Sequence, residues 1–145
     1  NLFEFKKFNV LLDFAHNAAG MRALKKFVDT MDGTPKVGII AGIGDRREQD
    51  NNDIGAVAAE MFDEIIIRQD KNLRGKTDVE IIRMLEVGIK KVDPKKPITV
   101  IPNEREAITY AIENGKEGSL IVLCSDIIPD ALNIVKELKD KDINS

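Results

Sequence analysis

The chain has 145 residues, of which 43% are hydrophobic and 32% charged, with one Cys, one His and a formal net charge of −3. A chain of this length forms about one domain and buries roughly 68–70% of its unfolded surface, so it needs no disulfide or metal to fold. No apolar run approaches the ~18 residues of a membrane span, and the interspersed charges do not favour nucleic acid or a membrane surface as a partner. We expect a soluble, cytoplasmic, single globular domain.

Short β-branched runs alternate with amphipathic segments along the chain, a pattern that predicts βαβ units around a parallel sheet. The expected strands are Val10–Phe14, Lys36–Gly42, Glu64–Arg68, Ile98–Pro102 and Ser119–Cys124, with Leu2–Phe5 as a weaker candidate for an edge strand. Consecutive apolar positions in several strands are typical of strands that helices cover on both faces. The predicted fold class is α/β: a Rossmann-like three-layer domain with a mostly parallel sheet of five or six strands.

Five helices are expected between and after the strands, because each of these segments has one apolar stripe at helical spacing. The stripes contain Met21, Leu24, Val28 and Met31; Ile54, Val57, Ala58 and Met61; Ile82, Leu85 and Ile89; Ala107, Ile108, Ala111 and Ile112; and Ile128, Leu132, Val135 and Leu138. Thr77 with Glu80, and Asn103 with Glu106, predict N-terminal caps for the third and fourth helices. The polar tail after Lys139 is expected to fray.

The loops that follow the strands differ from those that precede them. Turns into the strands contain ordinary Gly, Pro, Asn and Asp turn residues, whereas the segments 13–17, 42–47 and 69–76, which follow strands, contain charged residues and glycines. In open α/β sheets, ligands bind outside the carboxyl ends of the strands. The pattern therefore predicts a binding site at this edge of the sheet.

The first of these loops contains Asp13, His16 and Asn17. A carboxylate at the end of a strand can accept hydrogen bonds from ribose hydroxyls, and Asn17 with the following helix N-terminus can face an anion. Alternatively, Asn17 only caps the helix and Asp13 only accepts from nearby backbone N–H groups. A lone His cannot form a metal site, and we expect no metal ligands in this chain.

The second loop contains Gly44, Asp45, Arg46 and Arg47. Arg47 stands where a dinucleotide-binding fingerprint has its third Gly, so that motif is not met. A guanidinium here can bind a carboxylate or phosphate in bidentate fashion, or the loop is simply solvated with weak local ion pairs. Arg74 follows a third strand and is also a candidate for binding an anionic group.

Two further motifs have simpler interpretations. The segment Gly75-Lys76-Thr77 resembles the end of a P-loop, but Asp70 stands where the Walker pattern needs its first Gly. The chain therefore lacks that kind of phosphate cradle. Cys124 lies within an apolar strand and is expected to be an inert core thiol.

Four motifs together resemble the C-terminal domain of Mur-type ligases, and in particular that of the cyanophycin synthetases. They are DFAHNAAG over residues 13–20, GIGDRR over residues 42–47, FDE over residues 62–64 and LRGK over residues 73–76. The resemblance covers residues 1–138, nearly the whole chain. Ala18 replaces the Pro that is usual in the first motif, and residues 48–50 depart from the usual acidic run.

The resemblance implies a role in an ATP-dependent amide ligase that activates a carboxylate as an acyl phosphate for attack by an amine. It implies that Asp13 holds the ribose, that His16 and Asn17 lie near the nucleotide, and that Gly44, Asp45, Arg46, Arg47 and Arg74 serve the incoming substrate. In a cyanophycin-synthetase-like enzyme, arginine is added to aspartate side chains. No catalytic residue is expected within residues 1–145.

The P-loop, the catalytic lysine and most magnesium ligands of the family belong to a central domain. We therefore expect residues 1–145 to be one domain of a larger ligase, with that central domain and an amino-acid substrate as partners, ATP and magnesium as cofactors, and no activity in isolation. The larger enzyme is a candidate homo-oligomer. The alternatives are another Mur-type ligase, acting on muramyl peptides or folylpolyglutamate, or a stand-alone regulatory module that binds a nucleotide or an amino acid.

Overall fold

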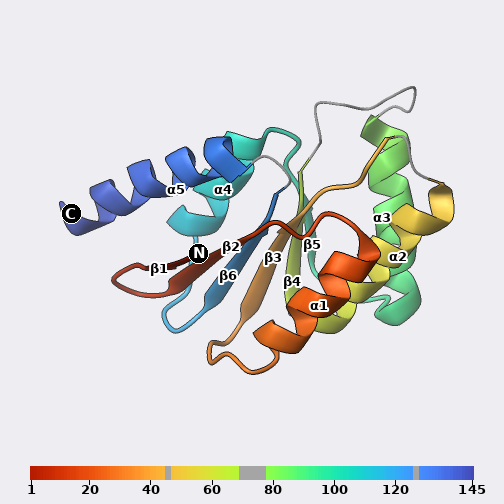
Figure 1. Ribbon diagram of the computed structural model, residues 1–145, viewed down its shortest axis with the longest axis horizontal. Helices are drawn as coiled ribbons and strands as arrows, with labels where there is room; N and C mark the ends of the chain where they lie inside the picture. The colour runs from red at the N-terminus through yellow and green to blue at the C-terminus, as the bar shows by residue number, and fades with distance from the viewer. Residues whose placement is uncertain (45–46, 69–77, 126–127) are drawn as a thin grey trace.

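The computed structural model describes residues 1–44, 47–68, 78–125 and 128–145, which form a three-layer α/β domain (Figure 1). One sheet has the strand order β1-β2-β6-β3-β4-β5. Its strands are β1 (Leu2–Glu4), β2 (Asn9–Asp13), β3 (Lys36–Ile40), β4 (Glu64–Ile67), β5 (Ile98–Val100) and β6 (Leu120–Cys124). Only β1 runs antiparallel to its neighbour within this sheet. The predicted fold class is confirmed, including the N-terminal edge strand.

Helices cover both faces of the sheet (Figure 1). The helices α1 (Ala18–Val28), α2 (Glu48–Met61) and α3 (Asp78–Val92) lie on one face, and α4 (Glu104–Glu113) and α5 (Ile128–Ile143) lie on the other. Parallel crossovers are right-handed, so the direction of travel decides the face. The chain moves in one direction from β2 to β5, and then returns from β5 to β6, which places α4 on the opposite face.

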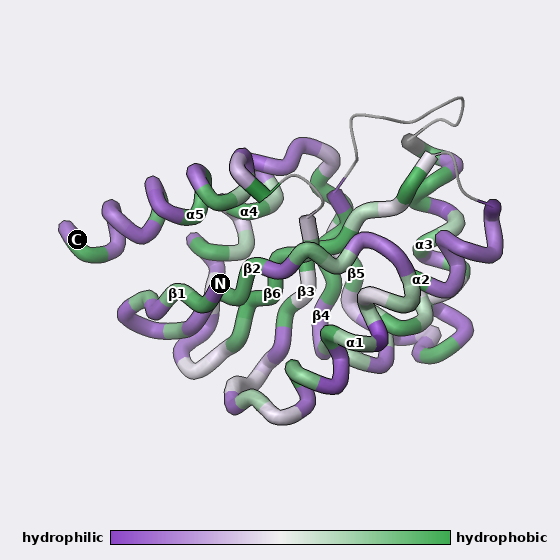
Figure 2. Tube along the Cα trace, viewed as in Figure 1, coloured by the Kyte–Doolittle hydropathy of each residue, from purple (hydrophilic) through white to green (hydrophobic). Residues whose placement is uncertain are grey.

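The core has two halves, separated by the sheet. Leu11 and Val122 point toward α1, α2 and α3, whereas their neighbours Val10, Leu12 and Ile121 point toward α4 and α5. This alternation follows from the period of two along a strand, and it explains why the strands are apolar at consecutive positions. Figure 2 shows the same hydrophobic centre between helices whose outer surfaces are hydrophilic.

The contact between α2 and α3 is unusually close. A Cβ at Gly55 would overlap the carbonyl oxygen of Leu85, and a Cβ at Gly88 would overlap that of Asn52. Only glycine at both positions allows the two backbones to approach in this way. The two helices that follow the second and third unusual loops are therefore packed directly against each other.

The structure differs from the predicted elements in the buried residues of α3 and in the end of α5, and it confirms one of the two predicted helix caps. In α3, Leu85 and Ile89 of the predicted stripe are buried, whereas Ile82 is only partly buried and Ile81, outside that stripe, is buried. The tail does not fray after Lys139: α5 continues to Ile143, and the Lys6 backbone N–H donates to Asp142 Oδ2 at 2.8 Å. The cap at Asn103 is confirmed by its bond from the Glu106 N–H, 2.9 Å, and Thr77 lies outside the described residues.

Candidate functional site

The carboxyl ends of four strands meet around a small cavity. It is lined by Ala15 and His16 after β2, Gly42 and Ile43 after β3, Arg68 after β4, and Cys124 at the end of β6. The chain turns toward opposite faces after β2 and after β6, which are neighbours in the sheet. This is the topological switch point at which open α/β sheets bind ligands.

Asp13 is the last residue of β2 and is partly buried. Its Oδ2 accepts a hydrogen bond from the backbone N–H of Ala15 at 2.9 Å. This is the only hydrogen bond that its carboxylate receives from the described part of the chain, so one oxygen remains an acceptor for a ligand. The structural role considered for Asp13 is thus observed, and its ribose-binding role stays a prediction.

Asn17 and His16 complete the first loop. Asn17 caps α1, because its Oδ1 accepts from the Gly20 N–H at 2.7 Å. His16 Nδ1 lies 3.0 Å from the Phe14 carbonyl oxygen. The imidazole of His16 and the phenyl ring of Phe14 meet edge to face, with their centroids 5.0 Å apart. A neutral imidazole held in this way carries its proton on Nδ1 and presents Nε2 as an acceptor.

An open groove of about 400 Å³ runs from this loop along α1. Its apolar wall includes the exposed rings of Phe14 and Phe27, and Asp13, His16 and Asn17 form its polar end. Exposed aromatic rings with a few polar groups at one end are typical of ligand sites. The groove therefore suits a flat, partly apolar group that carries hydroxyls.

A buried asparagine holds the second loop. Asn51, on α2, is 0% exposed and makes two hydrogen bonds to the backbone of Ile43, each 3.0 Å long. Sequence analysis did not select this residue. A signal was present, since Asn51 lies three residues before Ile54 and so continues the apolar stripe of α2 with a polar side chain.

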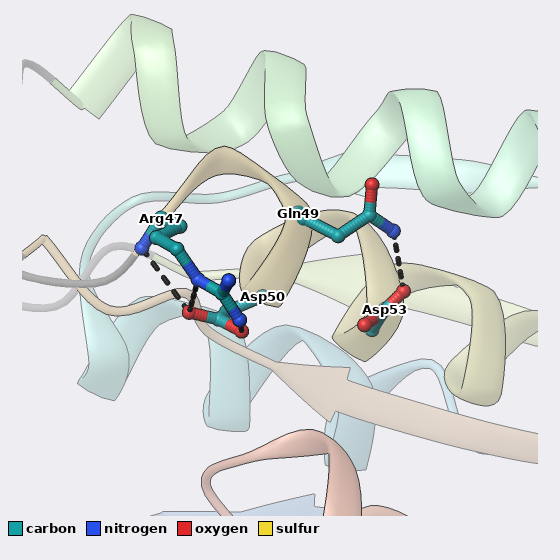
Figure 3. Close-up of polar contacts among 4 residues, drawn as sticks. All are labelled: Arg47, Gln49, Asp50 and Asp53. Atoms are coloured by element: carbon teal, nitrogen blue, oxygen red, sulfur yellow. Dashed lines mark hydrogen bonds and ion pairs between the residues drawn. The ribbon is translucent and has the colours of Figure 1, made fainter.

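Arg47 immediately precedes α2 and pairs with a residue of its own helix. Its Nη2 lies 3.1 Å from Asp50 Oδ1, its Nε donates to Asp50 Oδ2 at 3.3 Å, and its side chain is 82% exposed (Figure 3). The hydrogen bond to Asp50 raises the pKa of Arg47 above its ordinary value. Within the same helix, Gln49 Nε2 donates to Asp53 Oδ1 at 2.7 Å (Figure 3).

Of the other residues predicted to bind the substrate, the structure describes only Gly44. Gly44 is buried next to Ile43, at the end of a described segment. Asp45, Arg46 and Arg74 lie outside the described residues. Binding of an amino acid by any of these residues, and by Arg47, stays a prediction.

Arg68 is a second residue that sequence analysis did not select. Its Nη2 donates to the Cys124 carbonyl oxygen at 3.3 Å, and its Nε lies 3.4 Å from Glu104 Oε2. Ser125 Oγ also donates to that carboxylate oxygen, at 3.4 Å. Arg68 thus connects the ends of β4 and β6 to the start of α4. Its signal in the sequence is a single charge after three isoleucines.

Cys124 is buried, as expected for a core thiol. Burial raises the pKa of Cys124 to about 12, and the nearby carboxylate of Asp13 acts in the same direction. A protonated thiol is a poor nucleophile and a poor metal ligand. This residue therefore serves the packing of the sheet.

The described residues contain neither a metal-ligand cluster nor a helix able to span a membrane. No three side chains among His, Cys, Asp and Glu within residues 1–44, 47–68, 78–125 and 128–145 form a group that holds a metal ion. No helix in those same ranges combines the length and the apolar character needed to cross a membrane.

The fold and the position of the site define an open α/β domain with a binding site at the carboxyl edge of its sheet. The family model described as "Mur ligase, glutamate ligase domain" matches residues 2–127, and the chain belongs to this family. It is 34% identical over 139 residues to a cyanophycin synthetase from Synechocystis sp., an alignment that covers 96% of this chain and 16% of that enzyme. The chain therefore spans about one sixth of the relative's length.

Two solved structures show the same fold. A UDP-N-acetylmuramoyl-L-alanyl-D-glutamate–2,6-diaminopimelate ligase matches with a TM-score of 0.78 and 15% identity, covering 95% of this chain and 31% of that one. E. coli FolC in complex with ADP matches with a TM-score of 0.70 and 15% identity, covering 95% of this chain and 32% of that one. The predicted resemblance to the C-terminal domain of Mur-type ligases, with cyanophycin synthetases among the relatives, is confirmed.

Proposed function

We propose that this chain is the C-terminal domain of an ATP-dependent amide ligase of the cyanophycin synthetase type. In this proposal, the carboxyl edge of the sheet supplies a nucleotide subsite and an amino-acid subsite to a catalytic centre that is shared with a central domain. The larger ligase that contains the chain is called the parent enzyme below.

The observation that carries the proposal is the groove at Asp13. The second carboxylate oxygen of Asp13, Oδ1, is an acceptor for ribose hydroxyls. The rings of Phe14 and Phe27 offer an apolar surface for a base. The residues present therefore fit a nucleoside. The ADP complex of FolC, which has the same fold, supports a nucleotide as the ligand.

The second part of the proposal concerns the amino-acid substrate. Its α-carboxylate suits a guanidinium fork, and Arg46, Arg47 and Arg74 all follow strands at this edge. If the added amino acid is arginine and the acceptor an aspartate side chain, the substrate guanidinium needs a carboxylate. Asp45 and Asp70, in the same loops, and Glu48, the first residue of α2, are candidates.

The third part concerns what this domain lacks. ATP, when bound, supplies the phosphoryl group that activates the acceptor carboxylate, and the resemblance assigns the phosphate-binding loop, the catalytic lysine and most magnesium ligands to the central domain. Residues 1–145 then act by closing over the nucleotide and presenting the amino acid. The domain alone is expected to fold and to have no ligase activity.

The proposal is tested with the parent enzyme and with residues 1–145 in parallel. We expect the parent to release phosphate from ATP only when a poly-aspartate acceptor and arginine are both present, and the isolated domain to release none above a control without enzyme. Turnover with a muramyl peptide or a folate instead would indicate another Mur-type ligase. ATP binding with no ligase turnover by the parent would favour a regulatory module.

A further inference from the structure

Asn51 bonds to a loop of the site rather than to its own helix. Its Oδ1 accepts from the Ile43 N–H and its Nδ2 donates to the Ile43 carbonyl, so that one amide satisfies both backbone groups of one residue. Two opposed bonds of this kind fix the orientation of the peptide groups, as a neighbouring strand would. Ile43 is the central residue of the segment 42–44, which leads into the charged part of the second loop.

The same amide lies against α3. Asn51 Nδ2 is 3.7 Å from Met84 Sδ, and a Cβ at Gly42 would overlap Ile81 and come within 2.9 Å of Asn51 Oδ1. The backbone at Gly42, the side-chain amide of Asn51 and the side chain of Ile81 on α3 are therefore in close contact. Only glycine, which has no Cβ, fits at position 42. The helix α3 begins at Asp78, four residues after Arg74 in the sequence.

Other contacts make α2 and α3 a single rigid support. Arg83 Nη2, in the second turn of α3, lies 3.0 Å from Glu48 Oε1, in the first turn of α2, and this half-exposed pair contributes little. Further along, the close approach at Gly55 and Gly88 prevents the helices from sliding. Asn51 attaches the segment 42–44 to this support.

We propose that Asn51 is a positioning residue for the amino-acid substrate, because it fixes the segment that carries the charged second loop against α3. The inference rests on the proposed function and identifies a residue that sets the affinity for the amino acid. Asn51 does not line the groove that runs from Asp13 along α1 to Phe27, although Ile43, which it holds, shares the small cavity with His16.

The test uses the parent enzyme with Asn51→Ala and Asn51→Asp. The alanine variant removes both bonds, and the aspartate variant keeps the volume and the acceptor for the Ile43 N–H but loses the donor. We expect the KM for the amino acid to rise about tenfold in Asn51→Ala, since two partly buried backbone groups of Ile43 lose their partner, and at least as much in Asn51→Asp, whose buried carboxylate faces the Ile43 carbonyl oxygen. The KM for ATP should change less than twofold in both.

A matched control is Asn52→Ala, which alters a neighbouring buried asparagine whose Oδ1 has no hydrogen-bond partner in the described structure. It should leave both KM values unchanged. Hydrogen exchange of the Ile43 amide provides a measurement that needs no substrate: we expect faster exchange in Asn51→Ala than in the wild type or in Asn52→Ala. If Asn51→Ala does not fold, Asn51→Asp carries both measurements.

The outcomes separate two kinds of failure. An unchanged KM for the amino acid, with accelerated exchange at Ile43, would reduce Asn51 to a structural role and overturn this inference alone. An equal rise in both KM values would do the same. Wild-type parent enzyme without amino-acid-dependent turnover would refute the proposed function, and this inference with it.

Discussion

The guanidinium of Arg68 lies 3.4 Å from the carboxylate of Glu104, and the two side chains are only 6% and 17% exposed. Removing one partner of a buried ion pair costs about 3–5 kcal/mol, and less where the remaining charge keeps other contacts, as Arg68 does with the Cys124 carbonyl oxygen. We therefore expect Glu104→Ala to lower the free energy of unfolding by about 3 kcal/mol, measured by urea denaturation.

Arg105 and Glu137 provide the control for this prediction. Their ion pair is shorter, 2.8 Å, but both side chains are 57% exposed, so water and salt screen it. Glu137→Ala should destabilise the chain far less than Glu104→Ala. Equal losses would show that burial does not decide the strength of these pairs.

Asp13→Asn separates the two roles of this residue. The amide oxygen can still accept from the Ala15 N–H, but the charge is lost and an N–H₂ group faces the groove. A hydrogen bond to a charged group contributes about 1.5–3 kcal/mol, so the KM of the parent enzyme for ATP should rise roughly tenfold or more while the melting temperature stays nearly constant. A lower melting temperature with an unchanged KM would indicate that the carboxylate only stabilises the turn.

Arg74→Lys tests the amino-acid subsite. This prediction rests on the sequence, because Arg74 lies outside the described residues. Lysine keeps the positive charge but loses the planar fork that matches a carboxylate. In the parent enzyme, the KM for the amino acid should therefore rise while that for ATP stays nearly fixed. Equal effects on both substrates, or no effect, would remove Arg74 from the subsite.

Because the thiol of Cys124 is buried, we expect the folded chain to lose stability at alkaline pH. Its pKa is about 12 in the folded chain, against an ordinary value near 8.5 after unfolding, so the folded state binds more protons between these values. Stability therefore falls as the pH rises above about 9, by at most about 1.4 kcal/mol per pH unit from this group. Urea denaturation from pH 8 to pH 10.5 should give a steeper decline for the wild type than for Cys124→Ala. Parallel curves would contradict the buried, protonated thiol.

Much of the local structure was predictable because its causes are local. The strand Ser119–Cys124 was predicted within one residue of β6, since an apolar run is bounded there by Gly118 and a polar segment. The cap at Asn17 follows from turn chemistry in the same way. The order of the strands was not predictable, because hydrophobic periodicity does not report which strands are neighbours.

The candidate site was predictable to the level of its edge and its first loop. Arg68 was missed because its partner Glu104 is distant in the sequence, and only the sheet brings β4, β6 and α4 together. Asn51 was missed because it makes no bond typical of a helical asparagine. Its two bonds depend on how closely the segment 42–44 approaches α2, which is a tertiary property.

The central place of β6 has a consequence for how the chain acquires its structure during synthesis. The strand β6 is the last strand of the described sheet along the chain, yet it supplies the hydrogen bonds that join β2 to β3. Without β6, no strand pairing of the described sheet joins the hairpin β1–β2 to the parallel unit β3–β4–β5. Pairings of such long sequence separation form slowly. We therefore expect the edge that holds Asp13, Ile43 and Arg68 to be completed only when β6 has been inserted.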